Sequence, residues 1–234
     1  MAVNSSREDW KIEHGVFDQF TLRILEKLRG QGHFEDLKGT LALGKEANVF
    51  TVESEEPTVI KIYRLENRDF NQMLSYLVQD PRYMHIKRRK REIVFNWAQR
   101  EYRNLLLARE AIPVPKPIAH LKNVLVMEQI GKKHPAEQLK DLPPKNPEEF
   151  FAQVIDYMKK LWDINLVHGD LSNFNILNHN EHPIFIDFSQ CSRTDAPNAE
   201  ELWQRDVKNI QLAARKCGLE LPDKQFTRNE PTNE

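Results

Sequence analysis

The chain has 234 residues, with 34 Lys and Arg against 35 Asp and Glu, so its formal net charge is -1. This length suffices for one large domain or two small lobes, and the balanced charge excludes a uniformly basic nucleic-acid coat and an acidic tail protein. Two cysteines are too few for a disulfide framework or a Cys-rich zinc site, and no apolar run approaches the about 18 residues that span a membrane. We therefore expect a soluble cytoplasmic protein without membrane contact, and we favour a monomer.

The first half of the chain is predicted to contain helices and a small sheet. Apolar residues at helical spacing indicate an amphipathic helix that ends near Gly30, and β-rich stretches interrupted at Gly44 and at 55–57 indicate strands. Pro113 and Pro115 end the longest helix. In chain order we predict a helix at 17–30, three antiparallel strands within 40–62, a weak helix at 70–78, a strong helix at 92–110 and two strands near 118 and 124–127.

The second half is predicted to be mainly helical. Asn146, Pro147 and Glu149 form a helix start, with an N-cap residue, a proline at the first helical position and a capping-box acid. The predicted elements are a helix at 146–162, short apolar segments at 166–167, 176–177 and 184–186, and a last helix at 200–216. We divide the chain into a leader with its helix (1–39), a β-rich N-terminal lobe (40–131) with a basic insert at about 64–91, a helical C-terminal lobe (132–218) and a disordered tail (219–234).

The stretch from His168 to Asn175, followed by Asp187, carries most of the chemical information. Asp170 with Asn175 five residues later, and Asp187 after an apolar strand, suit phosphoryl transfer. That reaction needs a carboxylate near the attacking oxygen and hard oxygen ligands for Mg²⁺. A single Asp or Asn more often caps a helix or forms a turn. The three residues together, in this order, favour the phosphoryl-transfer interpretation, with His168 as a brace for the loop.

A lysine and a glutamate stand where apolar residues are expected. Lys61 interrupts an apolar strand, and Glu101 lies on the apolar face of its helix with Trp97 and Leu105. Because a buried charge needs a partner, we expect the two to pair, with Lys61 free to touch phosphate oxygens. The alternatives are a strand-edge lysine whose ammonium reaches water, and an ordinary pair between Glu101 and Arg103.

The residues 44–48 form a turn between two predicted strands. A tight turn with one glycine can fold over phosphates and present backbone N–H groups, with Lys45 adding a positive charge, but an ordinary hairpin has the same pattern. Neither G-x-G-x-x-G nor G-x-x-x-x-G-K-[ST] occurs anywhere in the chain. The turn is therefore a weak signal by itself.

Together these residues have the order of the protein-kinase signature set: phosphate loop, strand lysine, helix glutamate, catalytic loop and D-F-G. The chain departs from this set at several positions. Ala42 and Ala47 replace two glycines, Gly169 replaces the usual Arg, and Ser189 replaces the last Gly of D-F-G. No A-P-E motif follows Asp187, and the 47 remaining residues are too few for an activation segment and the usual helical lower lobe.

With these departures the sequence resembles the RIO family of atypical protein kinases over roughly residues 15–215. The matching stretches are Gly44–Val49, Val59–Arg64, Trp97–Leu105, Val124–Glu128, His168–Asn175 and Ile186–Asp187. The G-K-E-A-N-V form and the basic insert resemble the first of the two main branches. The second branch carries an N-terminal winged helix, for which the 43 residues before Gly44 are too few. The resemblance implies an α+β, two-lobed protein-kinase-like fold with a trimmed C-terminal lobe and an extra N-terminal helix.

The resemblance also implies roles for individual residues in an enzyme that uses ATP with Mg²⁺ or Mn²⁺. Lys61 would contact phosphates and pair with Glu101, Asp170 would be the catalytic carboxylate, and Asn175 and Asp187 would hold the metal. Asp187 would also accept phosphate, giving an aspartyl-phosphate intermediate. The residues implied in ATP binding, with Met127 as the gatekeeper, are Gly44, Lys45, Glu46, Ala47, Asn48, Val49, Lys61, Met127, Glu128, Ile130, Leu177 and Ile186.

The family assists late maturation of the small ribosomal subunit, so the resemblance implies a pre-ribosomal particle and its rRNA as partners. Residues 61–103 hold 11 Lys and Arg against 5 Asp and Glu, although the whole chain is nearly neutral. The run of basic residues at 87–91 either contacts rRNA phosphates or forms a solvated loop. Ser75 is a candidate autophosphorylation site beside this run.

Our leading interpretation is a RIO-type serine/threonine protein kinase or ATPase. One alternative is a small-molecule phosphotransferase of the aminoglycoside or choline kinase type, which shares an H-G-D…N…I-D pattern. The turn at 44–48 and the short C-terminal part argue against it. A second alternative is an ATP-switched module that binds RNA or the ribosome and has little kinase activity.

Overall fold

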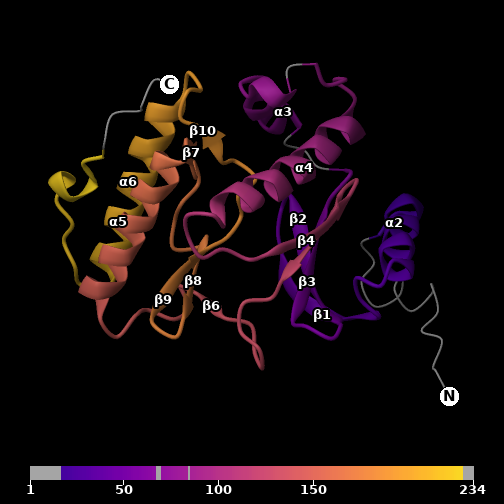
Figure 1. The fold of residues 1–234 in the computed structure, drawn as a ribbon, viewed down its shortest axis with the longest axis horizontal. Coiled ribbons are helices and arrows are strands. Elements are labelled where there is room, and N and C mark those ends of the chain that lie inside the picture. The colour runs from indigo at the N-terminus through magenta and orange to yellow at the C-terminus, as the bar shows by residue number, and fades with distance from the viewer. Residues whose placement is uncertain (1–16, 67–69, 84, 229–234) are drawn as a thin grey trace.

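The computed structural model describes residues 17–66, 70–83 and 85–228, and these residues form two lobes (Figure 1). The N-terminal lobe contains an antiparallel sheet of five strands, among the described residues, in the order β1-β2-β3-β5-β4. The strands are β1 (Asp36–Leu43), β2 (Ala47–Glu53), β3 (Thr58–Tyr63), β4 (Pro117–Leu121) and β5 (Val124–Glu128). The predicted strands are confirmed, although β1 begins inside the predicted leader 1–39.

Helices cover both faces of this sheet. On one face, α2 (Gln19–Gly30) packs Leu22, Leu25 and Leu28 against strand residues such as Ile60. On the other face lie α3 (Phe70–Val78) and α4 (Lys90–Ala108). Because side chains alternate along a strand, both faces of β3 are buried, and every residue of that strand is buried. This double cover explains why Lys61 lies in the interior.

The first turn of α4 begins earlier than predicted. Lys90 and Arg91 belong to this helix and not to the preceding insert, which contains α3 and the short 3₁₀ helix η1 (Pro81–Tyr83). Glu92 lies in the first turn, where the helix dipole favours an acidic side chain. The cations of Lys90 and Arg91 also lie over aromatic rings, 5.3 and 5.4 Å from the ring centres of Phe70 and Phe20.

The C-terminal lobe is built on two long helices, α5 (Pro147–Asp163) and α6 (Ala199–Lys216). The predicted cap is confirmed, since the Glu149 N–H donates to Asn146 Oδ1 over 3.3 Å. Short strands lie beside the helices. They are β6 (Glu137–Gln138), β8 (Ile176–His179) and β9 (His182–Phe185) in one sheet, and β7 (Leu166–Val167) with β10 (Ser192–Arg193) in another. Strands β6 and β10 were not predicted, because each has only two residues and these are polar, without the apolar signal that marked β7.

The prediction of a disordered tail at 219–234 is wrong for residues 219–228. Leu221 and Phe226 are buried, and Phe226 ends a 3₁₀ helix, η2 (Asp223–Phe226). The Arg228 guanidinium lies 3.9 Å from the ring centre of Trp162 on α5 and 4.7 Å from that of Trp203 on α6. Two apolar anchors and one stacked cation therefore hold a segment whose composition is polar. Residues 229–234 of the predicted tail and residues 1–16 of the predicted leader lie outside the described ranges.

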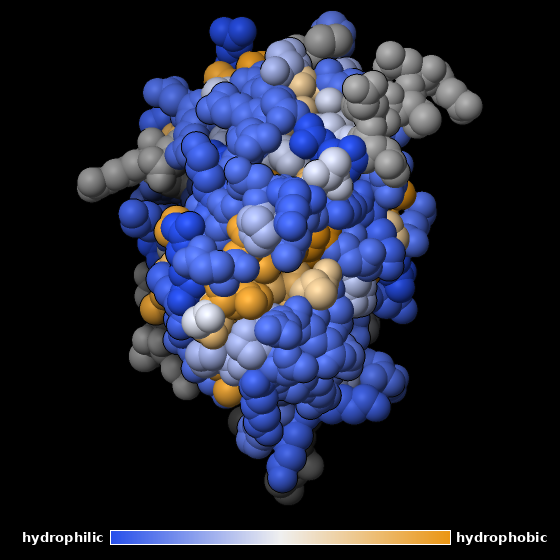
Figure 2. Space-filling model, turned by 90° about the vertical axis from the view of Figure 1, so that its left-hand side faces the viewer, coloured by the Kyte–Doolittle hydropathy of each residue, from blue (hydrophilic) through white to orange (hydrophobic). Residues whose placement is uncertain are grey.

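The face on the left of Figure 1 is mostly hydrophilic and has an apolar patch near its centre (Figure 2). Leu212 on α6 is one of the exposed large apolar side chains of this lobe, with 53% of its surface accessible. Within the part of the chain that the structure describes, no helix combines the length and the apolar character needed to cross a membrane.

Candidate active site

A buried ionic network joins the two lobes. Lys61 Nζ lies 2.8 Å from Glu101 Oε1 and 2.9 Å from Asp187 Oδ1. The Tyr63 hydroxyl donates a hydrogen bond to the second oxygen of Glu101. Burial alone would lower the pKa of Lys61, but the charges of Asp187 and Glu101 raise it above its ordinary value. Lys61 is therefore a permanent cation held between the sheet, helix α4 and the Asp187 loop.

The local sequence explains why these side chains meet. Val59, Lys61 and Tyr63 alternate along β3, so all three face α4. Glu101 lies one turn from Trp97 on the buried side of that helix. The predicted pair between Lys61 and Glu101 is present, and neither side chain snorkels to water or pairs with Arg103.

The loop after β7 is braced by His168, as expected. The Asp170 N–H donates to His168 Nδ1 over 3.3 Å, so Nδ1 is an acceptor. Nε2 must then carry the proton, and it donates to the Ile186 carbonyl over 3.0 Å. Burial lowers the pKa of His168 to about 4, which keeps the ring neutral. The histidine thus links the Asp170 loop to the residue before Asp187.

Asp206 on α6 anchors the same loop and was missed by sequence reasoning. Its carboxylate accepts the backbone N–H groups of Gly169 and Leu171 over 2.7 and 2.8 Å, and only 1% of the residue is exposed. Burial raises the pKa of Asp206 to about 7 against the opposing effect of these bonds. An acid on the apolar stripe that includes Trp203 and Val207 was the available signal.

Gly169, which stands where kinases usually have Arg, is required by the backbone. Its φ is +78°, in the region that favours glycine. A Cβ there would lie 3.2 Å from the Gln190 carbonyl oxygen and 3.3 Å from a methyl group of Leu202. Because Gly169 has no side chain, the loop can approach α6 closely enough for Asp206 to accept its backbone N–H groups.

Asp170 and Asn175 lie together beyond this anchor. Asn175 Nδ2 donates to the Asp170 carbonyl over 2.7 Å and to the Asp170 carboxylate over 3.2 Å. The amide nitrogen is therefore used, and the oxygen of Asn175 is the atom that a metal would contact. Burial, and next the charge of Asp187, raise the pKa of Asp170.

Two side chains hold one carboxylate oxygen of Asp187, Oδ1, and leave the other, Oδ2, available. Lys61 Nζ and the Ser189 hydroxyl both contact Oδ1, over 2.9 and 2.7 Å. The side chain is 37% exposed. Desolvation opposes ionisation, but the Lys61 charge and the Ser189 bond hold the pKa of Asp187 below its ordinary value. Ser189, a departure from D-F-G, is thus a hydrogen-bond donor that helps leave Oδ2 available.

This arrangement agrees with the comparisons with known proteins. A family model described as RIO domain matches residues 48–226. The chain belongs to the RIO family. It is 38% identical over 217 residues to the RIO-type serine/threonine-protein kinase Rio1 of Haloferax volcanii, covering 91% of this chain and 75% of that protein. It is 40% identical over 206 residues to Rio1 of Methanocaldococcus jannaschii, covering 87% and 71%. The resemblance stated from the sequence is confirmed, and the chain is a RIO-type kinase.

A solved structure supports the same fold. The Rio2 kinase–ADP/Mg²⁺–phosphoaspartate complex from Chaetomium thermophilum superimposes with a TM-score of 0.67 at 23% identity, covering 88% of this chain and 65% of that one. The predicted two-lobed, kinase-like α+β fold is therefore confirmed. The small-molecule phosphotransferase alternative finds no support, because the matched relatives are serine/threonine-protein kinases.

In this RIO kinase, the turn at 44–48 uses most of its side chains internally. The Gly44 N–H donates to the Ala47 carbonyl over 3.0 Å, and a Cβ on Gly44 would lie 2.7 Å from that oxygen. Glu46 accepts from the Trp97 indole over 3.3 Å, and the buried Asn48 accepts from Arg64 over 2.9 Å. Lys45 is exposed. Of the predicted ATP-binding side chains in the turn, Lys45 is thus the charged one that remains open to solvent.

The residues predicted to hold adenine lie along the connection between the lobes. Met127 is on β5, beside Val59 of β3, and Glu128 ends that strand. The Ile130 carbonyl accepts a hydrogen bond from the Ala136 N–H over 2.8 Å. The backbone group of Ile130 that is left for a nucleotide is therefore the N–H of Ile130. Half-buried Leu177 on β8 and Ile186 beside Asp187 supply apolar surface from the C-terminal lobe. Their roles in ATP binding stay predictions.

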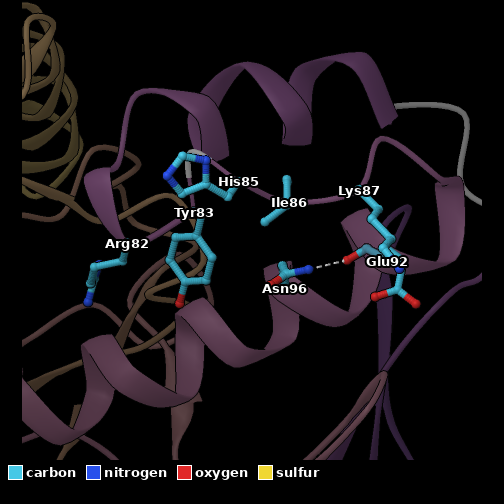
Figure 3. Close-up of a pocket in the computed structure, with 7 residues that line it drawn as sticks. All are labelled: Arg82, Tyr83, His85, Ile86, Lys87, Glu92 and Asn96. Atoms are coloured by element: carbon cyan, nitrogen blue, oxygen red, sulfur yellow. Dashed lines mark hydrogen bonds between the residues drawn. The ribbon is translucent and has the colours of Figure 1, made fainter.

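Exposed cations lie at the end of the insert and in the first turn of α4, next to a small cavity. Residues 87–91 are all exposed. Beside them lies a cavity of about 400 Å³, lined by Arg82, Tyr83, His85, Ile86, Lys87, Glu92 and Asn96 (Figure 3). Ser75 is exposed on α3, and its hydroxyl donates to the Gln72 carbonyl over 2.7 Å. Phosphorylation of Ser75 and rRNA contact at 87–91 stay predictions.

Proposed function

We propose that this RIO kinase binds ATP with Mg²⁺ and transfers the γ-phosphoryl group to its own Asp187. The observation that carries the proposal is the Asp187 carboxylate, whose Oδ1 is held by Lys61 and Ser189 while the side chain stays partly exposed. In the step, Oδ2 attacks the γ-phosphorus and the bond to the β–γ bridging oxygen breaks, releasing ADP. Water then cleaves the acyl phosphate to give inorganic phosphate and the carboxylate. The Rio2 kinase of Chaetomium thermophilum was solved as a complex with ADP, Mg²⁺ and phosphoaspartate, which supports an aspartyl-phosphate intermediate.

The residues present fit a magnesium ion. Asn175 and Asp187 offer an amide and a carboxylate oxygen, the hard donors that Mg²⁺ prefers. Among the described residues no group of three or more His, Cys, Asp or Glu could hold a metal alone. Mg²⁺ usually keeps waters and phosphate oxygens as its other ligands. When bound, it neutralises charge on the phosphates. Use of Mn²⁺ stays a prediction.

Asp170 would take the proton of an attacking hydroxyl or water. Burial raises the pKa of Asp170 from its ordinary value towards neutral pH, and a general base works best when its pKa is near the operating pH. Asn175 fixes the carboxylate through its amide. Lys61 would neutralise phosphate charge from the other side, with Glu101 keeping its ammonium in place. A serine or threonine acceptor, on this chain or another protein, would use the same base.

The proposal is tested by labelling the enzyme with ATP and measuring whether hydroxylamine removes the label. Incubation with radiolabelled ATP and Mg²⁺ should label the wild type, and hydroxylamine, which cleaves acyl phosphates, should remove the label. Asp187→Asn should abolish labelling, whereas Asp195→Asn, an exposed carboxylate on the same segment, should label like the wild type. Hydroxylamine-resistant label that persists in Asp187→Asn would contradict the proposal and direct attention to hydroxyl acceptors such as Ser75.

We also propose that the partner is a pre-ribosomal small subunit, contacted through its rRNA by the exposed cations at 87–91. Each lost phosphate contact should reduce the slope of log affinity against log salt by about one. Replacing Lys87, Arg88 and Arg89 with Ala should therefore weaken binding to pre-ribosomal particles and flatten the slope, and Lys208→Ala on α6 should not. An unchanged slope would contradict the contact. A cytoplasmic location and a monomeric state stay predictions.

The remaining alternative, an ATP-switched binding module, differs in its products. Particles that stimulate ATP turnover without forming a phosphorylated serine or threonine would favour the switch. Single-turnover measurements with and without particles separate the two, because a kinase would deliver label to a protein hydroxyl in at least one case.

A further inference from the structure

Helix α4 carries two fully buried polar side chains that the proposed chemistry does not use. Arg100 and Asn104 are both 0% exposed. Asn104 lies three residues after Glu101 and therefore on the same side of the helix. Buried polar groups are costly unless they are hydrogen-bonded, so their partners indicate what they do. The partners of Asn104 lie in the segment that directly follows Asp187.

The amide of Asn104 is fully used. Nδ2 donates to the carbonyl oxygens of Phe188 and Cys191 over 3.0 and 2.9 Å, and Oδ1 accepts from Arg82 over 2.9 Å. The partners fix the orientation, because a reversed amide would face two carbonyls with an oxygen and a guanidinium with an NH₂ group. Phe188 and Cys191 close a turn through the Cys191 N–H, which donates to the Phe188 carbonyl over 3.3 Å. Asn104 thus holds both ends of the turn after Asp187.

Arg82 is itself held in the insert. Its Nε and one NH₂ group contact the two carboxylate oxygens of Asp80 over 3.0 and 2.7 Å, and Asp80 is only 3% exposed. A planar fork on a carboxylate fixes the direction of the guanidinium. Asp80 Oδ2 also lies 3.6 Å from Arg100, whose NH₂ group donates to Ser192 Oγ over 2.8 Å. The insert is therefore connected through α4 to the segment 188–192 at two points.

Helix α4 determines the distance between Lys61 and Asp187. Glu101 fixes Lys61, and Asn104, on the same helix, fixes the backbone next to Asp187. One rigid helix therefore sets the position of both partners of the 2.9 Å contact. If the turn moved, the contacts on Oδ1 would break and Oδ2 would no longer be the oxygen presented.

We propose that Asn104 and Arg82 are positioning residues for phosphoryl transfer: they hold the turn after Asp187 so that its carboxylate presents Oδ2. The assignment rests on the proposed function in so far as Asp187 is the acceptor. The hydrogen bonds of Asn104 join it to Arg82, Phe188 and Cys191 and not to the Asp187 carboxylate. Asn104 acts through the backbone of Phe188 and Cys191.

The decisive variant is Asn104→Asp. It keeps the acceptor for Arg82 but replaces the two donors by an oxygen that repels the carbonyls of Phe188 and Cys191. The rate of phosphoenzyme formation should fall by about tenfold or more, with the KM for ATP changed less than about threefold. A rate equal to that of the wild type in a folded variant, or a rise in KM alone, would overturn the assignment. Asn71→Asp, an exposed amide on α3, is the matched control and should change neither value.

A double-mutant cycle tests whether Arg82 and Asn104 act as one unit. Arg82→Ala and Asn104→Ala should each slow phosphoenzyme formation, and the double variant should be no slower than the slower single variant. If the rate losses of the two single variants multiply in the double variant, Arg82 and Asn104 act independently, and the proposal that they act as one unit is wrong. Arg23→Ala, an exposed arginine on α2, should leave the rate unchanged.

Hydrogen exchange separates this assignment from the proposed function, since it needs no activity. In Asn104→Asp without nucleotide, the Cys191 N–H and its neighbours up to Ser192 should exchange faster, while the sheet amides of β3 should not change. Unchanged exchange in 188–192 would overturn the positioning role whatever the enzyme does. Faster exchange together with a wild type that forms no phosphoenzyme would leave the positioning intact and contradict the proposed function instead.

Discussion

The two lobes hold their functional side chains in different ways. In the N-terminal lobe, Lys61 is fixed by side-chain charges, those of Glu101 and Asp187. In the C-terminal lobe, the Asp170 loop is fixed through its backbone, which the neutral His168 and the buried Asp206 engage. A charge network fails as a unit when one member is removed, because the others are left buried and unpaired. A loop held by backbone bonds can instead lose one contact and keep the others.

The largest effect is expected from breaking the charge network. Lys61→Met leaves Glu101 buried without its cation, so the free energy of unfolding should fall by about 3–5 kcal/mol. Phosphoenzyme formation should fall by about 100-fold or more, since the phosphate contact and the hold on Asp187 are lost together. Denaturant unfolding and labelling with ATP measure the two losses.

Lys38→Met on β1 is the matched control, because this strand lysine is exposed. It should change both measurements little. A Lys61→Met variant with the stability and the rate of phosphoenzyme formation of the wild type would show that the charge network does not fail as a unit, which contradicts the comparison of the two lobes.

A smaller effect is expected from removing the anchor of the catalytic loop. Asp206→Ala leaves the N–H groups of Gly169 and Leu171 without their acceptor and should lower the free energy of unfolding by about 2–4 kcal/mol. ATP affinity should change less than the turnover rate, because Asp170 is displaced while the Lys61 network stays. Unfolding curves and the separate values of kcat and KM check this.

Glu201→Ala, an exposed acid on the same helix, should cost no more than about 1 kcal/mol. Equal losses in the two variants would show that Asp206 does not anchor the loop.

The smallest effect is a pH dependence that belongs to the C-terminal lobe. Burial lowers the pKa of His168 to about 4, whereas an unfolded histidine titrates near 6.5. Between these values the unfolded chain binds the proton of this histidine and the folded one does not. His168 therefore contributes a loss of stability of up to about 3 kcal/mol as the pH falls from about 6.5 towards 4, against the opposite contribution of Asp206, whose pKa is raised to about 7. His168→Gln should remove this part of the slope in unfolding measurements across that window.

His134→Gln provides the comparison, because His134 is exposed. It should keep the slope of the wild type. If His168→Gln kept it as well, the histidine would not be held neutral by burial.

Sequence patterns predicted the long helices and the strands of the N-terminal sheet, and they singled out the charged and polar residues that the structure brings together at the candidate site. Lys61 and Glu101 were visible because a charge in an apolar repeat must find a partner, and Asp170, Asn175 and Asp187 because their order and spacing match a family. The short strands β6 and β10 were missed because their two residues are polar and give no apolar signal. The tail was misjudged because composition does not show that Leu221 and Phe226 are buried in the core and that Arg228 lies over two tryptophan rings.

The sequence by itself determined the approximate bounds of the long helices and of the strands of the N-terminal sheet, and which residue types are available for phosphoryl transfer, because periodicity and local chemistry can be read along the chain. Only the tertiary structure decided which buried polar groups meet. Asp206 reaches Gly169, and Asn104 reaches Phe188, across 37 and 84 positions of the chain. Hydrogen bonds require separations near 3 Å and a fixed direction, and packing alone sets these between distant segments. The helical spacing places Asn104 on the same side of α4 as Glu101, but it does not show that two carbonyl groups after Asp187 accept its amide N–H groups.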